Sequence, residues 1–200
     1  TMDTDSGTVQ YVGRNVAETL TIKDFGAQDY YNLTINDANV TKATFQSGAA
    51  LDINGNLTLT AGTFNPSIYN TNIAGNWSNA ASGNFLTGAS TVIFDGTGTS
   101  TITGTTTFSN LTSTTAGKVL KFEAQSGGAP VFTVSGTFTI TGSSAYPIAI
   151  RSTIAGTQWL PHFLSAQTTV TFAYIEDSGC DTGTASVAPG VTNVYAGNNN

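Results

Sequence analysis

The sequence is short of cysteine, basic residues and long apolar runs, and each shortage excludes a class of protein. Cys180 is the one cysteine in 200 residues, so no internal disulfide can form. Six basic residues scattered along the chain cannot provide the clustered positive charge that nucleic acid or an anionic membrane surface requires. No apolar run approaches the ~20 residues of a transmembrane helix. We therefore expect neither a nucleic-acid partner nor membrane insertion.

Residues with catalytic or metal-binding chemistry are equally scarce. His162 is the one histidine, and no second histidine or cysteine lies near it in the sequence, which argues against a zinc site or a Ser-His-Asp triad. The densest acids are Glu176, Asp177 and Asp181. A weak calcium site at Asp177 and Asp181 is the alternative to solvated loop acids, because calcium takes several oxygen ligands. We predict no catalytic residue, no cofactor and no enzyme activity.

What the sequence has instead is threonine, serine, asparagine and glycine around alternating apolar residues. Charged residues make up 9% of the chain, against about 25% in an average globular domain. Apolar residues alternate with threonine in segments such as Asn56–Thr60 and Thr137–Thr141, and this period of two is typical of β-strands. Nothing sustains the period of a helix. The phase of the alternation predicts inward side chains at Val9, Tyr11, Leu33, Ile35, Leu57, Leu59, Val92, Phe94, Leu111, Phe132, Val134, Phe138, Ile140, Val170 and Phe172.

Four segments recur in the same order after ~80 residues, which is the sign of an internal repeat. The matching pairs are Thr8–Gly13 with Thr91–Gly96, Tyr30–Thr34 with Phe108–Thr112, Gln46–Gly48 with Gln125–Gly127, and Asn54–Thr60 with Ser135–Thr141. We place a repetitive domain at residues 1–176, with copies at about 7–89 and 90–167 and a third copy starting near 168. Residues 177–200 are rich in glycine, asparagine and alanine and are predicted to form a terminal coil, a linker or a donor strand.

The repeat length separates two all-β architectures. An ~80-residue unit exceeds the ~20 to 45 residues of an ordinary solenoid repeat but fits three or four coils of two or three short strands. We therefore predict a parallel β-helix, or β-solenoid, built from tandem ~80-residue repeats. The alternative is a tandem antiparallel β-sandwich. The short, regular Asn-Gly-Asn and Ser-Gly-Thr turns favour the solenoid, and no Cys–Trp–Cys pattern supports an immunoglobulin-type sandwich.

The ordered strand motifs resemble those of large bacterial surface proteins. The segments are Ser90–Gly96, Thr101–Gly104, Phe108–Thr112 and Gly136–Ile140, and the resemblance covers roughly residues 8 to 176. They are broadly similar to the repeats of autotransporter passengers and filamentous-haemagglutinin-type adhesins. The resemblance implies a surface-exposed structural or adhesive module, often a right-handed β-helix. Members of these families are usually far longer, and no secretion-domain motif of theirs is found in this sequence.

Two features of the sequence concern carbohydrate. Five N-x-[ST] sequons predict candidate glycosylation sites at Asn32, Asn39, Asn56, Asn76 and Asn110. The aromatic residues Trp77, Trp159, Tyr30 and Tyr31 fit either a sugar-stacking platform or core packing, and core packing is the commoner use of such residues.

Both ends of the chain carry strand-forming segments with little charge. We predict that Thr8, Val9 and Tyr11 at one end, and Val191, Val194 and Tyr195 at the other end, lie in strands that pair with another subunit or module. The predicted partners are further copies of the chain or neighbouring modules, together with cell-surface glycans.

The function that the sequence predicts is that of a non-enzymatic structural protein, a subunit or module of a surface filament or adhesin. We expect it to be extracellular or at the cell surface, with any signal peptide removed, because the first residues have neither a basic nor an apolar segment. The alternative is a polysaccharide-binding or polysaccharide-cleaving β-helix. A cleaving enzyme would need clustered acids and a base such as Arg151 in one groove.

Overall fold

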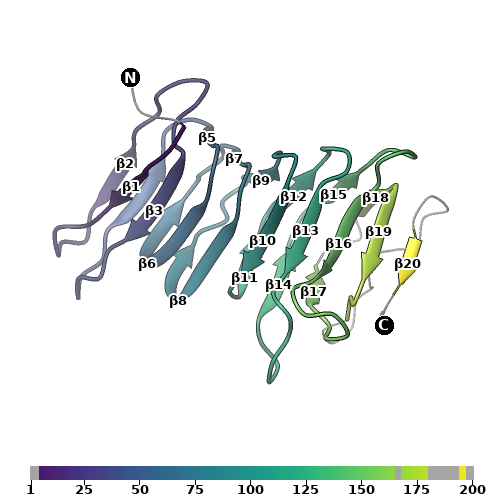
Figure 1. The fold of residues 1–200 in the computed structure, drawn as a ribbon. Coiled ribbons are helices and arrows are strands. Elements are labelled where there is room, and N and C mark those ends of the chain that lie inside the picture. Colours follow the sequence, from purple (N-terminus) through teal and green to yellow (C-terminus); the bar gives the residue numbers. More distant parts are fainter. Residues whose placement is uncertain (1–4, 165–167, 180–193, 197–200) are drawn as a thin grey trace.

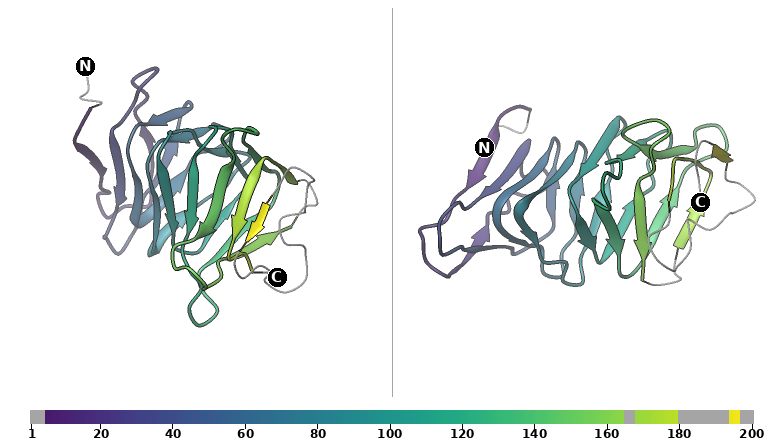
Figure 2. Two further views of the ribbon diagram at one scale, coloured as in Figure 1. Left: turned by 45° about the vertical axis from the view of Figure 1, so that its right-hand side comes forward. Right: turned by 90° about the horizontal axis from the view of Figure 1, so that it is seen from below.

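A computed structural model describes residues 5–164, 168–179 and 194–196, and every regular element in these ranges is a β-strand. The strands wind in coils that stack along one axis, with the two termini at opposite ends of the stack (Figures 1 and 2). Every pairing between the named strands is parallel. The predicted parallel β-helix is therefore confirmed, and the antiparallel sandwich is wrong.

Three faces form the sides of the coils. The first face carries, in spatial order, β1 (Thr8–Tyr11), β3 (Asn32–Asn36), β6 (Leu57–Asn65), β8 (Trp77–Phe85), β10 (Thr99–Thr103), β13 (Val119–Phe122), β16 (Ile148–Ser152), β19 (Ala173–Glu176) and β20 (Val194–Ala196). The second face begins with β2 (Thr19–Ile22) and β4 (Thr44–Ser47), continues in the C-terminal parts of β6 and β8, and ends in β11 (Thr106–Phe108), β14 (Val131–Val134) and β17 (Leu160–Phe163). The third face carries β5 (Leu51–Ile53), β7 (Thr71–Ile73), β9 (Thr91–Phe94), β12 (Asn110–Ser113), β15 (Phe138–Thr141) and β18 (Thr168–Thr171).

The corner between the first and second faces lies inside β6. Leu57 and Leu59 of β6 pair with β3 on the first face, whereas Thr63 pairs with β4 on the second. Gly62 turns this corner with a φ of 86°, a conformation that glycine adopts without a Cβ penalty. A Cβ at this position would lie 2.9 Å from the Cβ of Asp37 in the preceding coil. Glycine is thus required both for the bend and for the close stacking of coils.

One coil takes about 20 to 30 residues. Along the first face, Leu33 lies beside Leu57, Thr101 beside Lys121, and Lys121 beside Arg151, which are steps of 24, 20 and 30 residues. The ~80-residue spacing therefore spans three to four coils. The matched segments fall on different faces, because β1, β3 and β6 of the first face match β9, β12 and β15 of the third. The single coil is therefore the structural unit. The ~80-residue repeat reflects similar strand and corner segments that recur in the same order along the chain.

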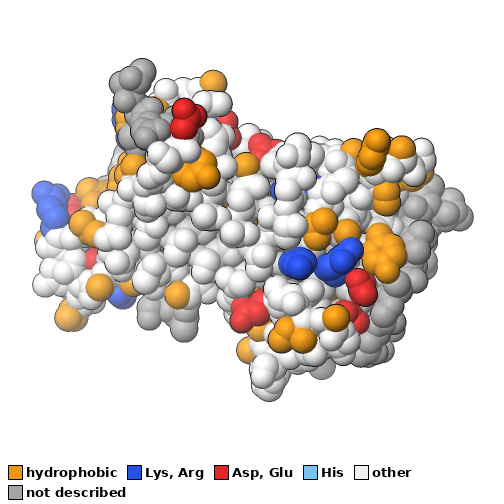
Figure 3. Space-filling model, in the orientation of Figure 1, with side chains coloured by type: hydrophobic (Ala, Val, Ile, Leu, Met, Phe, Trp, Pro, Cys, Tyr) orange, Lys and Arg blue, Asp and Glu red, His pale blue; other side chains and the backbone are white. Residues whose placement is uncertain are grey.

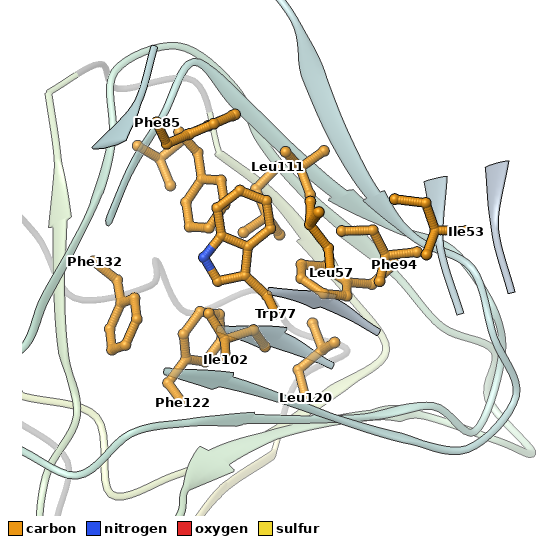
Figure 4. Packing of buried hydrophobic residues seen from close by; sticks show 14 of the residues in the cluster. Ile53, Leu57, Trp77, Phe85, Phe94, Ile102, Leu111, Leu120, Phe122 and Phe132 are labelled. Carbon is orange, nitrogen blue, oxygen red and sulfur yellow. The ribbon is translucent and has the colours of Figure 1, made fainter. Parts of the chain in front are cut away.

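Inward side chains from all three faces fill the stack with one continuous apolar core. Trp77 lies near the middle of this core with no exposed surface, and its ring centroid is 4.9 Å from that of Phe85 and 5.2 Å from that of Phe108 (Figure 4). The indole Nε1 donates a hydrogen bond to Thr106 Oγ1 at 3.2 Å, so its polar atom is satisfied. Each coil contributes only a few such residues, so the core exists only because neighbouring coils stack.

The predicted core is confirmed except at the end of β18. Val9 and Tyr11 of the first coil are partly buried and pack against the core, and the predicted residues from Leu33 to Val170 are buried. Phe172 is half-buried and lies outside the core cluster, so its predicted inward position is wrong. It follows the last residue of β18 and adopts a φ of 50°, which ends the strand alternation before this side chain.

Of the predicted C-terminal segment 177–200, the structure describes residues 177–179 and strand β20. β20 pairs in parallel with β19, with Tyr174 beside Val194 and Ile175 beside Tyr195. Val194 and Tyr195 therefore lie in the last strand of the first face. Val191, Cys180 and Asp181 lie outside the described residues.

Candidate functional sites

The first coil leaves an open sheet edge at the N-terminal end of the stack. Within the described ranges, β3 is the one strand neighbour of β1, and β4 is the one strand neighbour of β2. The residues predicted for assembly at this end, Thr8, Val9 and Tyr11, all lie in β1. An edge strand presents backbone N–H and C=O groups with which another strand can pair.

The backbone N–H and C=O groups of β1 point alternately toward β3 and toward the open edge. The Gly7 carbonyl accepts a hydrogen bond from Asn32 N at 3.1 Å. In a strand of a parallel sheet, the N–H and C=O groups of one residue point to the same side, and the side alternates from residue to residue. The backbone groups of Val9 therefore point toward β3, as the Gly7 carbonyl does. Thr8 and Gln10 then direct their N–H and C=O groups to the open edge, and their side chains are exposed. These two residues can be changed without removing a β1–β3 bond.

The first coil exposes three large apolar side chains among its polar and charged residues. Val12, Val16 and Phe25 have exposed fractions of 55%, 54% and 46%. The hydroxyls of Tyr11 and Tyr30 form a hydrogen bond of 2.8 Å, and the Tyr30 ring packs edge-on against Phe25 with centroids 5.7 Å apart. The end of the stack therefore presents ordered aromatic and aliphatic surface beside unpaired strand edges.

Three sequon asparagines form a ladder along the corner that leads into the first face. Asn56 N donates to Asn32 Oδ1 at 2.8 Å, and Asn76 N donates to Asn56 Oδ1 at 2.9 Å. Thr101 N continues the ladder by donating to Asn76 Oδ1 at 2.8 Å. Each side-chain carbonyl thus binds a backbone N–H of the next coil, which ties successive coils together at the corner.

The side-chain amides of most sequon asparagines are also engaged in hydrogen bonds. Asn56 Nδ2 donates to Asn32 Oδ1 at 3.0 Å, Asn39 Nδ2 donates to the Gly13 carbonyl at 2.9 Å, and Asn110 Nδ2 donates to the Ser90 carbonyl at 3.2 Å.

N-glycosylation attaches the glycan to this same nitrogen, so it would compete with these bonds. Asn32 Nδ2 is likewise engaged, donating to the Gly7 carbonyl at 3.0 Å. Asn76 is the one of the five sequon asparagines that is exposed, which makes it the most accessible candidate.

The aromatic residues that sequence analysis considered for sugar stacking lie mostly in the core. Trp77, Trp159 and Tyr30 are 0%, 1% and 0% exposed, so core packing is confirmed for them. Trp159 stacks on Phe122 with ring centroids 4.3 Å apart and an interplanar angle of 14°. Tyr31 is half-buried. A sugar-stacking platform made of these four residues is therefore excluded.

The C-terminal half of the first face instead carries a small patch that sequence analysis did not identify. Lys121 of β13 and Arg151 of β16 are side by side in register and face outward. The Arg151 guanidinium carbon lies 5.7 Å from the ring centroid of Tyr174 on β19. Figure 3 shows the two blue side chains next to each other with a large apolar side chain at their flank. We call Lys121, Arg151 and Tyr174 the cationic patch.

The acids near this patch have different roles. Glu176 Oε2 lies 3.8 Å from Arg151 Nε, so the structure brings together the acid and the base that sequence analysis named. Glu123 Oε2 accepts a hydrogen bond from Gly104 N at 2.7 Å. Asp177, a calcium candidate, is 2% exposed, and its Oδ2 accepts a hydrogen bond from Gly156 N at 2.9 Å. Asp177 thus anchors a turn, and no group of three or more histidine, cysteine or acidic residues among the described residues could hold a metal ion.

His162 lies apart from these acids. It is half-buried on β17 of the second face, in register with Thr133 of β14.

A second group of titratable residues lines the corner between the third and first faces. Burial raises the pKa of Asp29 and of Asp52, and repulsion from Asp95 and Asp29 raises the pKa of Asp52 further. Lys118 is fully buried, its Nζ donates to the Gly96 carbonyl at 2.8 Å, and burial lowers its pKa to about 8. Packing of the coils therefore removes these groups from water, and this desolvation disfavours their charged forms.

An open depression of about 520 Å³ lies at the corner that follows β10 and β13. It is lined by residues that include Asn79, Thr105, Glu123, Ser126 and Pro130. One wall is the loop 123–130, which projects from the stack below β14 (Figure 1). The depression is lined by neutral residues apart from Glu123, whose carboxylate already binds a backbone N–H.

No helix in the described part of the chain has the length and apolar character needed to cross a membrane. Comparison of the chain with protein-family models, with curated proteins and with solved structures found no match.

Proposed function

We propose that this chain is a non-enzymatic, extracellular structural module of a surface filament or adhesin, and that it assembles through its terminal coils. The observation that supports this most directly is the first coil, where β1 and β2 each have one strand neighbour and where Val12, Val16 and Phe25 are exposed around them. An open edge flanked by exposed apolar side chains is the surface that another strand or coil can cover.

The proposed contact is heterologous, between the first coil of one module and the last coil of the next. β20 lies at the opposite end of the same sheet as β1, so one more parallel strand pairing would continue the first face across the contact. Contacts of this kind propagate into a linear array unless the rotation closes a ring. The neighbour is a second copy of the chain or an adjacent module of similar coils.

The test is an edge variant that removes the outer bonds of β1 alone. Gln10→Pro deletes an outward N–H, whereas Gln10→Ala keeps it and serves as the matched control. We expect the unchanged chain and Gln10→Ala to form larger species with rising concentration in sedimentation velocity and short arrays in negative-stain images. Gln10→Pro should remain a folded monomer. An unchanged chain that stays monomeric at millimolar concentration would contradict the proposal.

The exposed apolar side chains of the first coil provide an independent variant. Phe25→Lys adds a charge to the proposed contact at a side chain that is already 46% exposed. It should weaken association, whereas Ile154→Lys, at an exposed residue of a later coil, should not.

A second candidate function is a polysaccharide-binding or polysaccharide-cleaving β-helix. The observation that favours it is the placement of Lys121, Arg151, Glu176 and Tyr174 on one face. Burial of Trp77 and Trp159 argues against extended aromatic stacking.

A further inference from the structure

We propose that the cationic patch binds carboxylated polysaccharide, with uronate carboxylates held between Lys121 and Arg151. This inference goes beyond end-to-end assembly, because it concerns the side of the stack and not its ends. It rests on the distribution of charge, on the partners of the two cations and on the apolar surface beside them.

Charge on the first face changes abruptly along the stack. In the first four coils the outward position next to the corner is taken by Thr8, Asn32, Asn56 and Asn76, all neutral. The next coil places Thr101 there, and the following two place Lys121 and Arg151. The chain has only six basic residues, and two of them lie in register on adjacent coils of a protein of net charge −6, with Glu176 of the next coil beside Arg151.

Neither cation is fully used by the fold. Among the described residues, no hydrogen bond or ion pair involves the Lys121 ammonium. Arg151 makes one ion pair, through Nε to Glu176 at 3.8 Å, which is too long for a hydrogen bond. The terminal guanidinium nitrogens therefore retain donors for a ligand oxygen, and a guanidinium binds a carboxylate best through two such donors.

The surface beside the two cations is apolar. Val119, Ala149 and Tyr174 are in register on β13, β16 and β19, two residues before Lys121 and Arg151 on their own strands. Because side chains two residues apart share a face of a strand, this apolar row runs parallel to the cationic pair at a short distance. A uronate ring has an apolar face and a carboxylate at its edge, so it matches this surface in both respects.

The same features disfavour other anionic polymers. A nucleic acid needs many cations along its backbone, and the cationic patch offers two. An acidic peptide would engage the cations without needing the apolar row.

The test measures binding of the monomeric chain to polygalacturonate by affinity electrophoresis and calorimetry. Fully methyl-esterified polygalacturonate is the matched probe, because it keeps the sugar backbone and removes the carboxylate charge. We expect binding to the first and at least tenfold weaker binding to the second. Lys121→Gln and Arg151→Gln should each weaken binding by about tenfold, in line with loss of one charge-assisted hydrogen bond. Lys23→Gln removes an exposed lysine of the first coil and should change nothing.

Further variants and probes test whether the sugar ring contributes to binding in addition to the carboxylate charge. Tyr174→Ala should weaken binding and Tyr174→Phe should preserve it, since the ring and not the hydroxyl contacts the sugar. Lys121→Gln breaks no bond to a described residue, so it remains a valid test if Arg151→Gln is unstable. Equal binding of polyglutamate, stronger binding of heparin than of polygalacturonate, or equal binding by Lys121→Gln and Lys23→Gln would overturn the proposal. None of these outcomes depends on whether the chain assembles.

Discussion

At the scale of single residues, two aspartates show that the stacked coils can either lower or raise the pKa of a carboxyl group. Asp37 is fully buried, yet its carboxylate accepts hydrogen bonds from Ala43 N at 2.6 Å and from Asn39 Nδ2 at 2.7 Å. Burial alone would raise the pKa of Asp37, but these bonds outweigh it and hold the pKa below its usual range. Among the described residues none donates such a hydrogen bond to the Asp52 side chain, and burial with repulsion from Asp95 and Asp29 raises its pKa.

We predict that Asp52→Asn stabilises the protein at neutral pH, by about 0.5–1 kcal/mol for a partly exposed group. The folded-state pKa of Asp52 lies above the unfolded value, so the ionised form weakens the fold once the pH exceeds both values. The gain should therefore be present at pH 7 and disappear as the pH falls below about 4. Asn72, the register neighbour in the next coil, shows that an amide fits this column. Urea unfolding at several pH values measures the effect.

Asp37→Asn is the matched control with the opposite sign. It would turn an amide N–H toward Ala43 N or Asn39, and it should cost about 1–3 kcal/mol at pH 7. Because the folded-state pKa of Asp37 is lowered, this loss should shrink as the pH falls through that pKa. Two variants with the same sign at pH 7 would contradict the assignment of these environments.

At the scale of elements, each strand is only three to nine residues long and depends on the strands of neighbouring coils. The strands hold their register by two devices. Inward aromatic and aliphatic side chains fix which face of the strand is buried, since a slip of one residue would turn them to solvent. At the corner, the ladder through Asn32, Asn56 and Asn76 fixes where each coil starts.

We expect Phe94→Ala and Phe138→Ala each to cost about 3–5 kcal/mol in free energy of unfolding, because both rings are buried and their removal leaves a cavity. Phe172→Ala is the control, since Phe172 lies past the end of its strand and is half-buried. It should cost less than half as much. Thermal and urea unfolding of the three variants compare the losses, and an unchanged midpoint for Phe94→Ala would show that the inward phase of β9 is wrong.

At the scale of the whole molecule, the stack has two kinds of surface, for which we propose different uses. The end of the first coil presents strand edges and apolar side chains, whereas the side of the first face presents the cationic patch. A linear array joined through the ends would leave every copy of the patch exposed along its length. Assembly and carbohydrate binding are therefore compatible, and an array would raise the avidity of individually weak patches.

We predict that the protein binds carboxylated polysaccharide without cleaving it. Of the acids near the patch, Asp177 is buried in a turn, Glu123 accepts a backbone hydrogen bond and Glu176 pairs with Arg151. Cleavage by two carboxyl groups requires a pair that flanks the scissile bond, with one of them free to donate a proton. Incubation with pectin, alginate, chitin and xylan, followed by reducing-end and unsaturated-product assays, should show no turnover. Activity that Glu176→Gln abolishes would show that the protein is an enzyme.

Much of this architecture follows from sequence alone. The alternation of apolar residues and threonine predicts strands and their inward phase, because a strand has a strict period of two and one face must be buried. Val92 with Phe94, and Phe138 with Ile140, are placed correctly on that basis. Short turns and recurring strands favour a solenoid over the tandem antiparallel sandwich, which only the parallel strand pairing of the structure excludes.

What only the tertiary structure decided is which residues meet across coils. Lys121 and Arg151 are 30 residues apart, and the coils differ in length by as much as ten residues, so no regular spacing in the sequence pairs them. The same irregularity puts the two ~80-residue copies on different faces. Local alternation is dictated by the geometry of a single strand, whereas register between coils depends on the length of each corner. The corners are set by packing, as Gly62 against Asp37 shows, and packing is a property of the assembled stack.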